Sequence, residues 1–403
     1  MGLVGIAAIL AASYGLSANR ARIGWRAVGW GLALQVGLAL LVLKTPFGVV
    51  FQVVGRGFNQ TMAYAEQGSG FVFGELGRSS GPQGVVLAFQ VLPLIIFVAS
   101  LFAVLYYLGV MQLALRGMAW VMQRSLGVSG AEALNVAANV FMGQNEAPLT
   151  IRPYLDKLTR SELMTLMTGG MATISGALMV AYAQIGKAPV ENLLTAVVMT
   201  APAAIALAKV FEPETSVPET LGGIPKSSAV DDRNVIDAAA RGAGEGLMLS
   251  LYVGAMLVAF IGLIALLNGV VGGVKEWTGL GWLPGDVQTV LGWIFAPVAF
   301  ALGVDWSDAG VVGNLLGTRV VLNEFIAYVE LGQLRETLQP RSFLIAGYAL
   351  CGFANLGSIG VQLGGIGSLI PERRREMAEL GLRAMVAATF ANFLTAAIAG
   401  LLI

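Results

Sequence analysis

Residues 139–153 read Asn-Val-Phe-Met-Gly-Gln-Asn-Glu-Ala-Pro-Leu-Thr-Ile-Arg-Pro, and they decide the fold. They follow the mostly apolar segment 131–142, which would extend about 18 Å as a helix. A bilayer core is roughly 30 Å thick, so this segment is too short to cross it. Gly143 breaks the helix, and Pro148 suits the first turn of a second one. The stretch predicts a helical hairpin that enters a membrane and turns back, with amides and a carboxylate at its tip.

The alternative interpretation is a polar surface loop between two ordinary helices. Loops seldom carry so little charge between such apolar flanks. Broken helices at membrane depth are tolerated where they are buried in protein or line a cavity. Secondary transporters build their substrate sites from such elements. We therefore favour the re-entrant hairpin.

The composition indicates an all-α polytopic membrane protein. Of 403 residues, 56% are hydrophobic and only 12% are charged. A soluble protein carries about twice that share of charge. The formal net charge of zero argues against a nucleic-acid partner. The chain has no histidine, which excludes Ser-His-Asp catalysis and histidine zinc sites, and its one cysteine, Cys351, cannot form an internal disulfide. No enzyme chemistry and no cofactor are expected.

About eight transmembrane helices are expected. Their ranges are 3–16, 28–43, 85–110, 163–185, 190–208, 247–267, 343–363 and 382–402. Segment 47–75 mixes apolar and polar residues and predicts an amphipathic helix along the membrane face. The polar linker 212–246 is expected to be a solvated connection with at most one short helix.

Lys and Arg in short loops indicate the orientation. They place the N-terminus outside and these residues inside: Arg20, Arg22, Arg26, Arg116, Arg124, Arg152, Lys157, Arg160, Lys226, Arg233, Arg241, Arg373, Arg374 and Arg375. This parity requires that segment 282–303 does not cross the membrane.

Short matches recur in the same order in both halves of the chain. Leu-Gly-Val at 126–128 recurs at 302–304, Asn-Glu at 145–146 recurs at 323–324, and the Gly-containing stretch 170–173 resembles 352–355. Ordered matches favour duplication. With the charge parity, they predict inverted repeats, each with a re-entrant hairpin. The second hairpin is expected at 307–331, turning near Gly317 and Thr318; its alternative is an extracellular loop.

Ionisable groups at membrane depth mark functional sites. The acidic candidates are Glu146 and Glu324, one in each repeat. Polar breaks follow each of them in the next span, at 173–176 and 355–358. Free carbonyls at such breaks suit a hard cation, and carboxylates accept hydroxyl protons. These residue types indicate a neutral, hydroxyl-rich solute beside a cation.

These motifs resemble those of the concentrative nucleoside transporter family. The resemblance rests on Gly-Gln-Asn-Glu-Ala-Pro at 143–148 with Arg-Pro-Tyr at 152–154, on Asn-Glu-Phe at 323–325, and on 349–360 running into 364–367 and 371–374. It implies a homotrimer in the cell inner membrane, with scaffold parts at 1–115 and 213–281 and transport parts at 116–212 and 282–403. The transport parts would move like an elevator.

The resemblance also implies roles for individual residues. Gln144 and Glu146 would contact the nucleobase beside Asn145, with Phe353 packing on the ring, and Glu324, Asn355 and Ser358 would hold the ribose hydroxyls. Sodium would be bound by the Asn139 and Thr173 side chains and by carbonyls of Met142, Thr173 and Ile174. Asn145 departs from the Thr that sodium-coupled bacterial relatives often have, which leaves the preferred base open.

The function expected from the sequence is sodium-driven import of a nucleoside such as uridine. A proton-coupled nucleoside symporter is the alternative within transport. A membrane-embedded enzyme using intramembrane carboxylates and a passive channel are alternatives from other classes.

Overall fold

The computed structural model describes residues 1–78, 86–225, 232–280 and 282–403, and within these ranges it is helical with no β-strand. The first half contains α1 (Gly2–Gly15), η1 (Arg20–Arg22), α2 (Trp25–Lys44), α3 (Gly48–Phe73), η2 (Gly74–Gly77), α4 (Leu87–Tyr107), α5 (Val110–Leu126), α6 (Gly130–Asn139), η3 (Ala147–Lys157), α7 (Arg160–Ala172), α8 (Gly176–Ile185) and α9 (Val190–Phe211). The second half contains α10 (Val235–Thr278), α11 (Val287–Leu302), α12 (Trp306–Val321), α13 (Glu324–Gln333), α14 (Pro340–Leu350), α15 (Leu356–Leu369), η4 (Pro371–Arg373) and α16 (Arg374–Leu402). The all-α prediction is confirmed.

Six helical segments of the described chain are long and apolar enough to cross a membrane: α2, α4, α7 with α8, α9, α10 and α16. The other two expected spans are the short α1 and the pair α14 and α15. Val85, the predicted start of the third span, and Lys226, expected on the inner side, lie outside the described residues. Val110 was wrongly assigned to the third span, because it begins α5.

The linker was predicted too long. Residues 212–225 are irregular except for turns, but residues 235–246 are the first turns of α10. This 44-residue helix extends about 66 Å at 1.5 Å per residue, twice a bilayer core.

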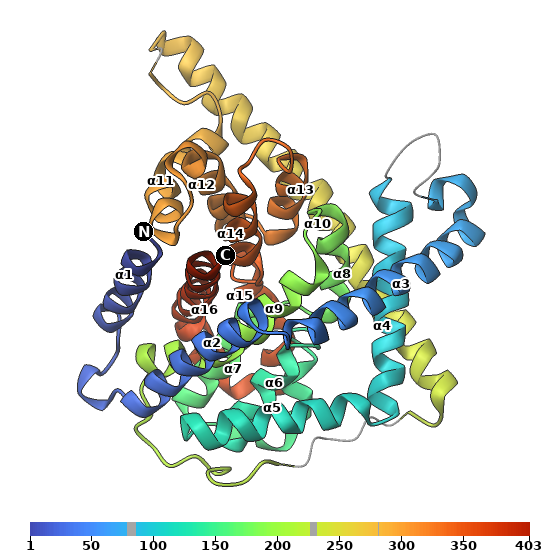
Figure 1. Cartoon of the computed structure of the whole chain (residues 1–403), viewed down its shortest axis with the longest axis vertical. Coiled ribbons are helices and arrows are strands. Elements are labelled where there is room, and N and C mark those ends of the chain that lie inside the picture. The colour runs from blue at the N-terminus through green and yellow to red at the C-terminus, as the bar shows by residue number, and fades with distance from the viewer. Residues whose placement is uncertain (79–85, 226–231, 281) are drawn as a thin grey trace.

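The internal repeat is visible in the order of the elements. The series α5, α6, η3, α7, α8, α9 is matched by α11, α12, α13, α14, α15, α16. In Figure 1, α5 lies at one end of the long axis of the molecule and α11 at the opposite end. The two hairpins therefore enter from opposite ends, as inverted repeats require. Helices α11 and α12 bend by 116° at their junction, consistent with segment 282–303 not crossing.

The first hairpin forms, with two corrections to its arms. Its first helix ends at Asn139 rather than Met142, and its second arm is a 3₁₀ helix with a non-helical residue at Ile151. Pro148 occupies the first turn of this arm, as predicted. The carbonyl of Phe141 accepts a bond from the Gly176 N–H at 3.0 Å, which ties the hairpin tip to the break between α7 and α8.

The second hairpin turns later than predicted. Helix α12 passes straight through Gly317 and Thr318, and the turn lies at Leu322 and Asn323. Gly317 serves packing instead, because a Cβ there would lie 2.7 Å from the Cβ of Leu291 in α11. The glycine permits a close helix contact and does not mark a turn.

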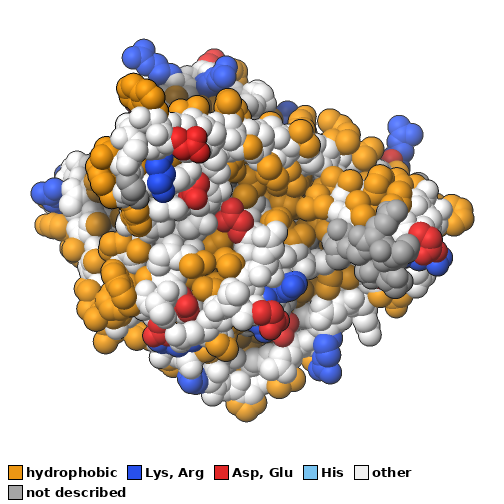
Figure 2. All heavy atoms as spheres, turned by 90° about the horizontal axis from the view of Figure 1, so that it is seen from above, with side chains coloured by type: hydrophobic (Ala, Val, Ile, Leu, Met, Phe, Trp, Pro, Cys, Tyr) orange, Lys and Arg blue, Asp and Glu red, His pale blue; other side chains and the backbone are white. Residues whose placement is uncertain are grey.

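Helices α4 and α10 pack along each other, with α3 against α4, while α1 and α2 contact α16 and α9. Much of α10 is exposed among the described residues: Val258 is 79% exposed and Leu266 is 63% exposed. Figure 2, which views the molecule from above, shows hydrophobic side chains reaching the surface beside scattered charges. Such an apolar exterior suits contact with lipid.

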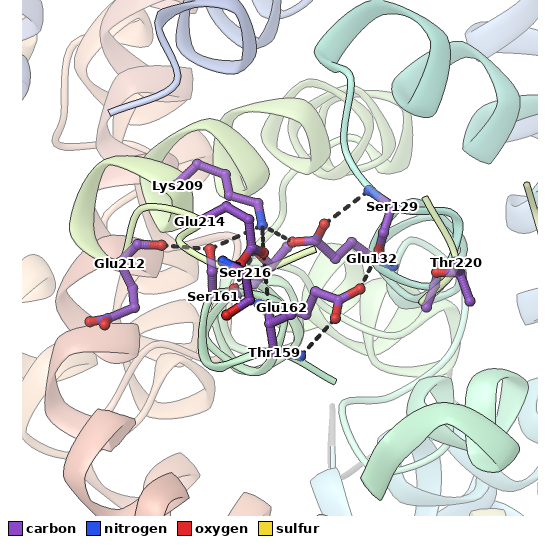
Figure 3. Close-up of polar contacts among 12 residues, drawn as sticks. Ser129, Glu132, Thr159, Ser161, Glu162, Lys209, Glu212, Glu214, Ser216 and Thr220 are labelled. Atoms are coloured by element: carbon purple, nitrogen blue, oxygen red, sulfur yellow. Dashed lines mark hydrogen bonds and ion pairs between the residues drawn. The ribbon is translucent and has the colours of Figure 1, made fainter. Parts of the chain in front are cut away.

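A buried polar network anchors the segment after α9 to the bases of α6 and α7 (Figure 3). The Lys209 ammonium forms an ion pair with Glu132, contacts the Glu214 carboxylate at 3.3 Å and donates to the Ser161 hydroxyl at 3.0 Å. Glu162 accepts from the Ser129 hydroxyl at 2.6 Å. The side chains of Lys209 and Glu132 are only 6% and 1% exposed. The network thus links the capped N-terminal turns of α6 and α7 to the Lys209 ammonium.

We expect Lys209→Met to destabilise the protein strongly. Removing one partner of a buried ion pair leaves the other charge uncompensated, which costs about 3–5 kcal/mol. Thermal unfolding in detergent should show a clearly lower midpoint. The double variant Lys209→Met with Glu132→Gln should recover part of the loss, because it removes both charges. Equal midpoints for Lys209→Met and wild type would contradict this role.

Candidate functional site

A cavity of about 590 Å³ lies between α4, α10 and the tips of the two hairpins. Its lining includes all seven residues predicted to bind substrate: Gln144, Asn145, Glu146, Glu324, Phe353, Asn355 and Ser358. Met142 also lines it, whereas Asn139, Thr173 and Ile174 are buried and do not line it. The structure therefore brings both acidic residues, one from each repeat, to a single cavity.

Glu324 is held by hydrogen bonds from both repeats. Its Oε1 accepts from the Tyr182 hydroxyl at 2.7 Å, and its Oε2 accepts from Asn355 Nδ2 at 2.9 Å. Glu324 is only 6% exposed. A carboxylate offers about four lone-pair positions. These bonds use two of them, so acceptor capacity remains for a ligand in the cavity.

Helix capping explains why these side chains lie at the breaks. Asn323 Oδ1 accepts from the Ile326 N–H at 3.0 Å and starts α13. Asn355 Oδ1 accepts from the Ser358 N–H at 2.9 Å and starts α15. Asparagine is among the preferred N-cap residues because its oxygen satisfies an N–H that has no partner in the helix. Capping by Oδ1 leaves Asn355 Nδ2 to donate to Glu324.

The tip of the first hairpin presents Gln144, Asn145 and Glu146 in succession. The Glu146 carboxylate lies against Gly143, where a Cβ would collide with its Oε2, and the side chain is accessible through the cavity. Asn145 Oδ1 would collide with a Cβ at Gly365 of α15. Gln144 Oε1 accepts from Gln362 Nε2 at 3.1 Å. A Cβ at position 143 or 365 would therefore displace the Glu146 or Asn145 side chain from the place it takes here.

The predicted cation ligands flank two contacts between the first hairpin and the broken helix α7–α8. The Phe141 carbonyl accepts from the Gly176 N–H, and a Cβ at Gly169 would lie 3.7 Å from Asn139 Nδ2. Asn139 is 1% exposed, its Nδ2 donates to the Asn135 carbonyl at 3.0 Å, and its buried Oδ1 accepts no hydrogen bond from any described residue. The Thr173 hydroxyl donates to the Gly169 carbonyl at 2.9 Å, which leaves its oxygen lone pairs available. Hard cations take oxygen ligands. A buried oxygen without a donor therefore fits the expected sodium site.

The sequence reasoning missed four residues that support the site. Tyr182 binds Glu324, and Gln362 binds Gln144. Arg319 and Asn392, both 0% exposed, contact backbone carbonyls at the ends of the broken helices. Arg319 could have been identified from the sequence, because it is an ionisable residue within a predicted intramembrane hairpin. Tyr182 stands two helical turns after the break at Ser175, a position that follows only once the break is located.

Three family models together match nearly the whole chain. They are Na+ dependent nucleoside transporter N-terminus at residues 4–76, Nucleoside recognition at 88–189, and Na+ dependent nucleoside transporter C-terminus at 192–400.

Curated relatives match along their whole length or most of it. The chain is 42% identical to an uncharacterized transporter of Haemophilus influenzae, covering 100% of this chain and 97% of the relative. It is 39% identical to the putative nucleoside permease NupX of Escherichia coli, covering 100% and 98%. It is also 39% identical to the sodium/nucleoside cotransporter 1 of Rattus norvegicus, covering 99% of this chain and 63% of that protein.

The fold matches solved structures of CNTnw. The inward-facing, substrate-bound state has a TM-score of 0.92 at 41% identity, covering 100% of this chain and 97% of that one. An outward-facing state of a doubly substituted CNTnw has a TM-score of 0.93 at 40% identity with the same coverage. The chain therefore belongs to the concentrative nucleoside transporter family, a family of Na+ dependent membrane transporters and not of enzymes.

Proposed function

We propose that this protein is a symporter that imports nucleosides into the cytoplasm, driven by a sodium gradient. The observation that carries the proposal is the meeting of Glu146 and Glu324 in one cavity. The first hairpin also carries the buried Asn139 Oδ1, which has no hydrogen-bond donor among the described residues. Between them these groups can accept hydroxyl protons, contact a nucleobase and bind a cation.

We assign the ribose to the second repeat. Glu324 would accept the hydroxyl protons of a 2′,3′-diol with the capacity that Tyr182 and Asn355 leave free. The Ser358 hydroxyl lies at the first turn of α15 and lines the same cavity. Phe353, 8% exposed, would pack on the flat base, and Gln144, Asn145 and Glu146 would contact its polar edge.

We assign sodium to Asn139, Thr173 and the carbonyls of Met142, Thr173 and Ile174. The Phe141 carbonyl already binds the Gly176 N–H, so the hairpin tip and the helix break form one unit. A cation bound there would order the tip that carries Gln144 and Glu146. Coupling of this kind is reciprocal: sodium would raise the affinity for nucleoside, and nucleoside would raise that for sodium by the same factor.

We further propose a homotrimer in the bacterial inner membrane with elevator-type movement. The scaffold parts would comprise the chain before α5 together with α10, whose exposed apolar face suits lipid or subunit contacts. The predicted boundary at residue 115 falls inside α5, so we place it at Gly109, which precedes that helix with a φ of 83°. Two transport parts, one beginning at α5 and the other at α11, would move against this scaffold.

Uptake by proteoliposomes tests the proposal. Purified protein should accumulate labelled nucleoside against its gradient when sodium is high outside, and should not when choline replaces sodium at constant pH. Accumulation driven by a pH gradient alone would favour the proton-coupled alternative. Equilibration without accumulation would indicate a passive channel, and conversion of the nucleoside would indicate an enzyme.

We expect Asn139→Ala to weaken the sodium dependence specifically. It removes the one ligand oxygen that the structure shows buried without a donor. The sodium concentration for half-maximal uptake should rise about tenfold or more, the loss expected for one charge-assisted contact. Asn268→Ala is a matched control, because the Asn268 side chain bonds Gln288 and the Val287 N–H at the junction of α10 and α11. An unchanged sodium response in Asn139→Ala would remove the cation assignment.

A further inference from the structure

Gln362 lies in α15, fully buried, and makes two hydrogen bonds through one nitrogen. Its Nε2 donates to the Met167 carbonyl of α7 and to Gln144 Oε1 at the tip of the first hairpin, each at 3.1 Å. It is 0% exposed. A side-chain amide group thus joins both repeats at the wall of the cavity.

The chemistry of these contacts fixes the direction of both amides. A backbone carbonyl only accepts hydrogen bonds, so the Gln362 atom that faces Met167 must be the NH₂ group. The second hydrogen of that group points at Gln144, so the Gln144 atom that meets it must be the oxygen. The reverse orientation of either amide would place two acceptors or two donors in contact. The Met167 carbonyl therefore fixes the orientation of the Gln362 amide, and the Gln362 amide in turn fixes that of the Gln144 amide.

Gln144 is then left with its NH₂ group for the ligand. Gln144 lines the cavity, its Oε1 is engaged by Gln362, and no described residue accepts a bond from its Nε2. The approach is close, because a Cβ at Gly170 would lie 2.8 Å from Gln362 Nε2 and 3.0 Å from the Gln144 Cβ. Gly170 thus gives these two side chains room to meet over α7.

We propose that Gln362 is a positioning residue that holds Gln144 as a hydrogen-bond donor toward the nucleobase. The site then requires an acceptor, a carbonyl oxygen or a ring nitrogen, on the base edge that meets Gln144. Glu146, two residues later, supplies the opposite property, because an ionised carboxylate only accepts. A fixed donor beside a fixed acceptor selects bases that carry an acceptor next to an N–H. The inference rests on the proposed nucleoside transport.

The test compares wild type and Gln362→Met in proteoliposomes, using nucleosides in which one base acceptor is deleted (deaza) or weakened (thio). Uptake of labelled uridine and adenosine is inhibited with unlabelled parent, with 2-thio- and 4-thiouridine, and with 1-, 3- and 7-deazaadenosine. In wild type, one analogue of the better-transported parent should inhibit about tenfold more weakly than the parent, the effect of leaving a donor unpaired. In Gln362→Met, Gln144 is free to turn, so this difference should shrink to within twofold while the parent is still transported.

Gln362→Glu supplies a second readout. A carboxyl group in place of the amide has one proton, which the Met167 carbonyl takes. The same oxygen can then only accept from Gln144, which turns the Gln144 amide and presents its oxygen to the base. The analogue penalty should disappear in this variant too. A wild type that tolerates every acceptor deletion, or a penalty that persists unchanged in both variants, overturns the proposal while nucleoside transport stands. A wild type that transports neither parent and binds neither in calorimetry overturns the proposed function and this inference together.

Discussion

Glu324→Ala is expected to abolish nucleoside uptake while the protein still folds and assembles. The substitution removes the acceptor for the Tyr182 hydroxyl and for Asn355 Nδ2, and with it the proposed acceptor for two ribose hydroxyls. Hydrogen bonds to a charged group are worth about 1.5–3 kcal/mol each. Losing two substrate bonds of this kind lowers affinity by about a hundredfold or more.

Glu324→Gln separates charge from shape. The amide keeps the volume of the side chain, but its NH₂ group must face either the Tyr182 hydroxyl or the Asn355 NH₂. The Tyr182 hydroxyl can accept, so the amide donates there and its oxygen accepts from Asn355 Nδ2. The ribose then meets one neutral acceptor oxygen in place of two charged ones, so transport should stay severely impaired. Glu330→Gln is the matched control on the same helix, since Glu330 accepts from Asn314 Nδ2 at 3.2 Å and does not line the cavity. The measurement is sodium-driven uptake at equal amounts of protein; near-normal uptake by Glu324→Ala would remove the ribose assignment.

Both hairpins and the acidic residues Glu146 and Glu324 could be predicted from the sequence, because each has a local signal. A short apolar segment ending in Gly143, followed by Pro148, cannot be a span, and carboxylates among apolar residues stand out. The second hairpin shows the limit of that reasoning. Gly317 was predicted as a turn, yet α12 continues through it, because the glycine makes room for Leu291. Sequence alone does not distinguish a glycine that ends a helix from a glycine that permits close packing of a neighbouring helix.

The supporting contacts could not be predicted because they join segments far apart in the chain. Gln362 binds Gln144 across 218 positions, and Tyr182 binds Glu324 across 142. Neither side chain belongs to a short motif, and each is ordinary within its own helix. The choice of Asn139 as a cation ligand came from family resemblance. Its unpartnered oxygen is a property that only the packed structure displays.

Arg319→Met is expected to cause the second large loss of nucleoside uptake, because it disturbs both helix breaks. Arg319 Nη1 donates to the Ala349 carbonyl at 2.9 Å, its Nε donates to the Gly352 carbonyl at 3.3 Å, and its Nη2 donates to Asn392 Oδ1. Asn392 Nδ2 in turn donates to the Ala172 carbonyl at 2.7 Å and to the Cys351 carbonyl at 2.8 Å. Carbonyls at a helix end have no partner in the helix. One guanidinium and one amide therefore satisfy the ends of α7 and α14.

These two ends carry the two halves of the proposed site. Ala172 directly precedes Thr173, assigned to sodium, and Gly352 directly precedes Phe353, assigned to the nucleoside. Arg319→Met leaves three buried acceptors without a donor, at about 1–3 kcal/mol each. We expect uptake to fall at least a hundredfold, and sodium to lose most of its effect on nucleoside affinity in binding measurements.

Arg319→Lys and Arg341→Met distinguish the loss of the Arg319 hydrogen bonds at the helix breaks from a general loss of stability. A lysine ammonium is a point charge that cannot reproduce the planar fork over three acceptors, so Arg319→Lys should recover uptake only in part. Arg341 donates to the Gly400 carbonyl at 2.8 Å, away from the breaks, and Arg341→Met should transport nearly normally. Binding is measured at a temperature at which every variant is folded, so that a lower unfolding midpoint does not affect the comparison. If Arg319→Met keeps the wild-type dependence of nucleoside affinity on sodium, the two breaks are positioned without the arginine, and its proposed role in coupling is overturned.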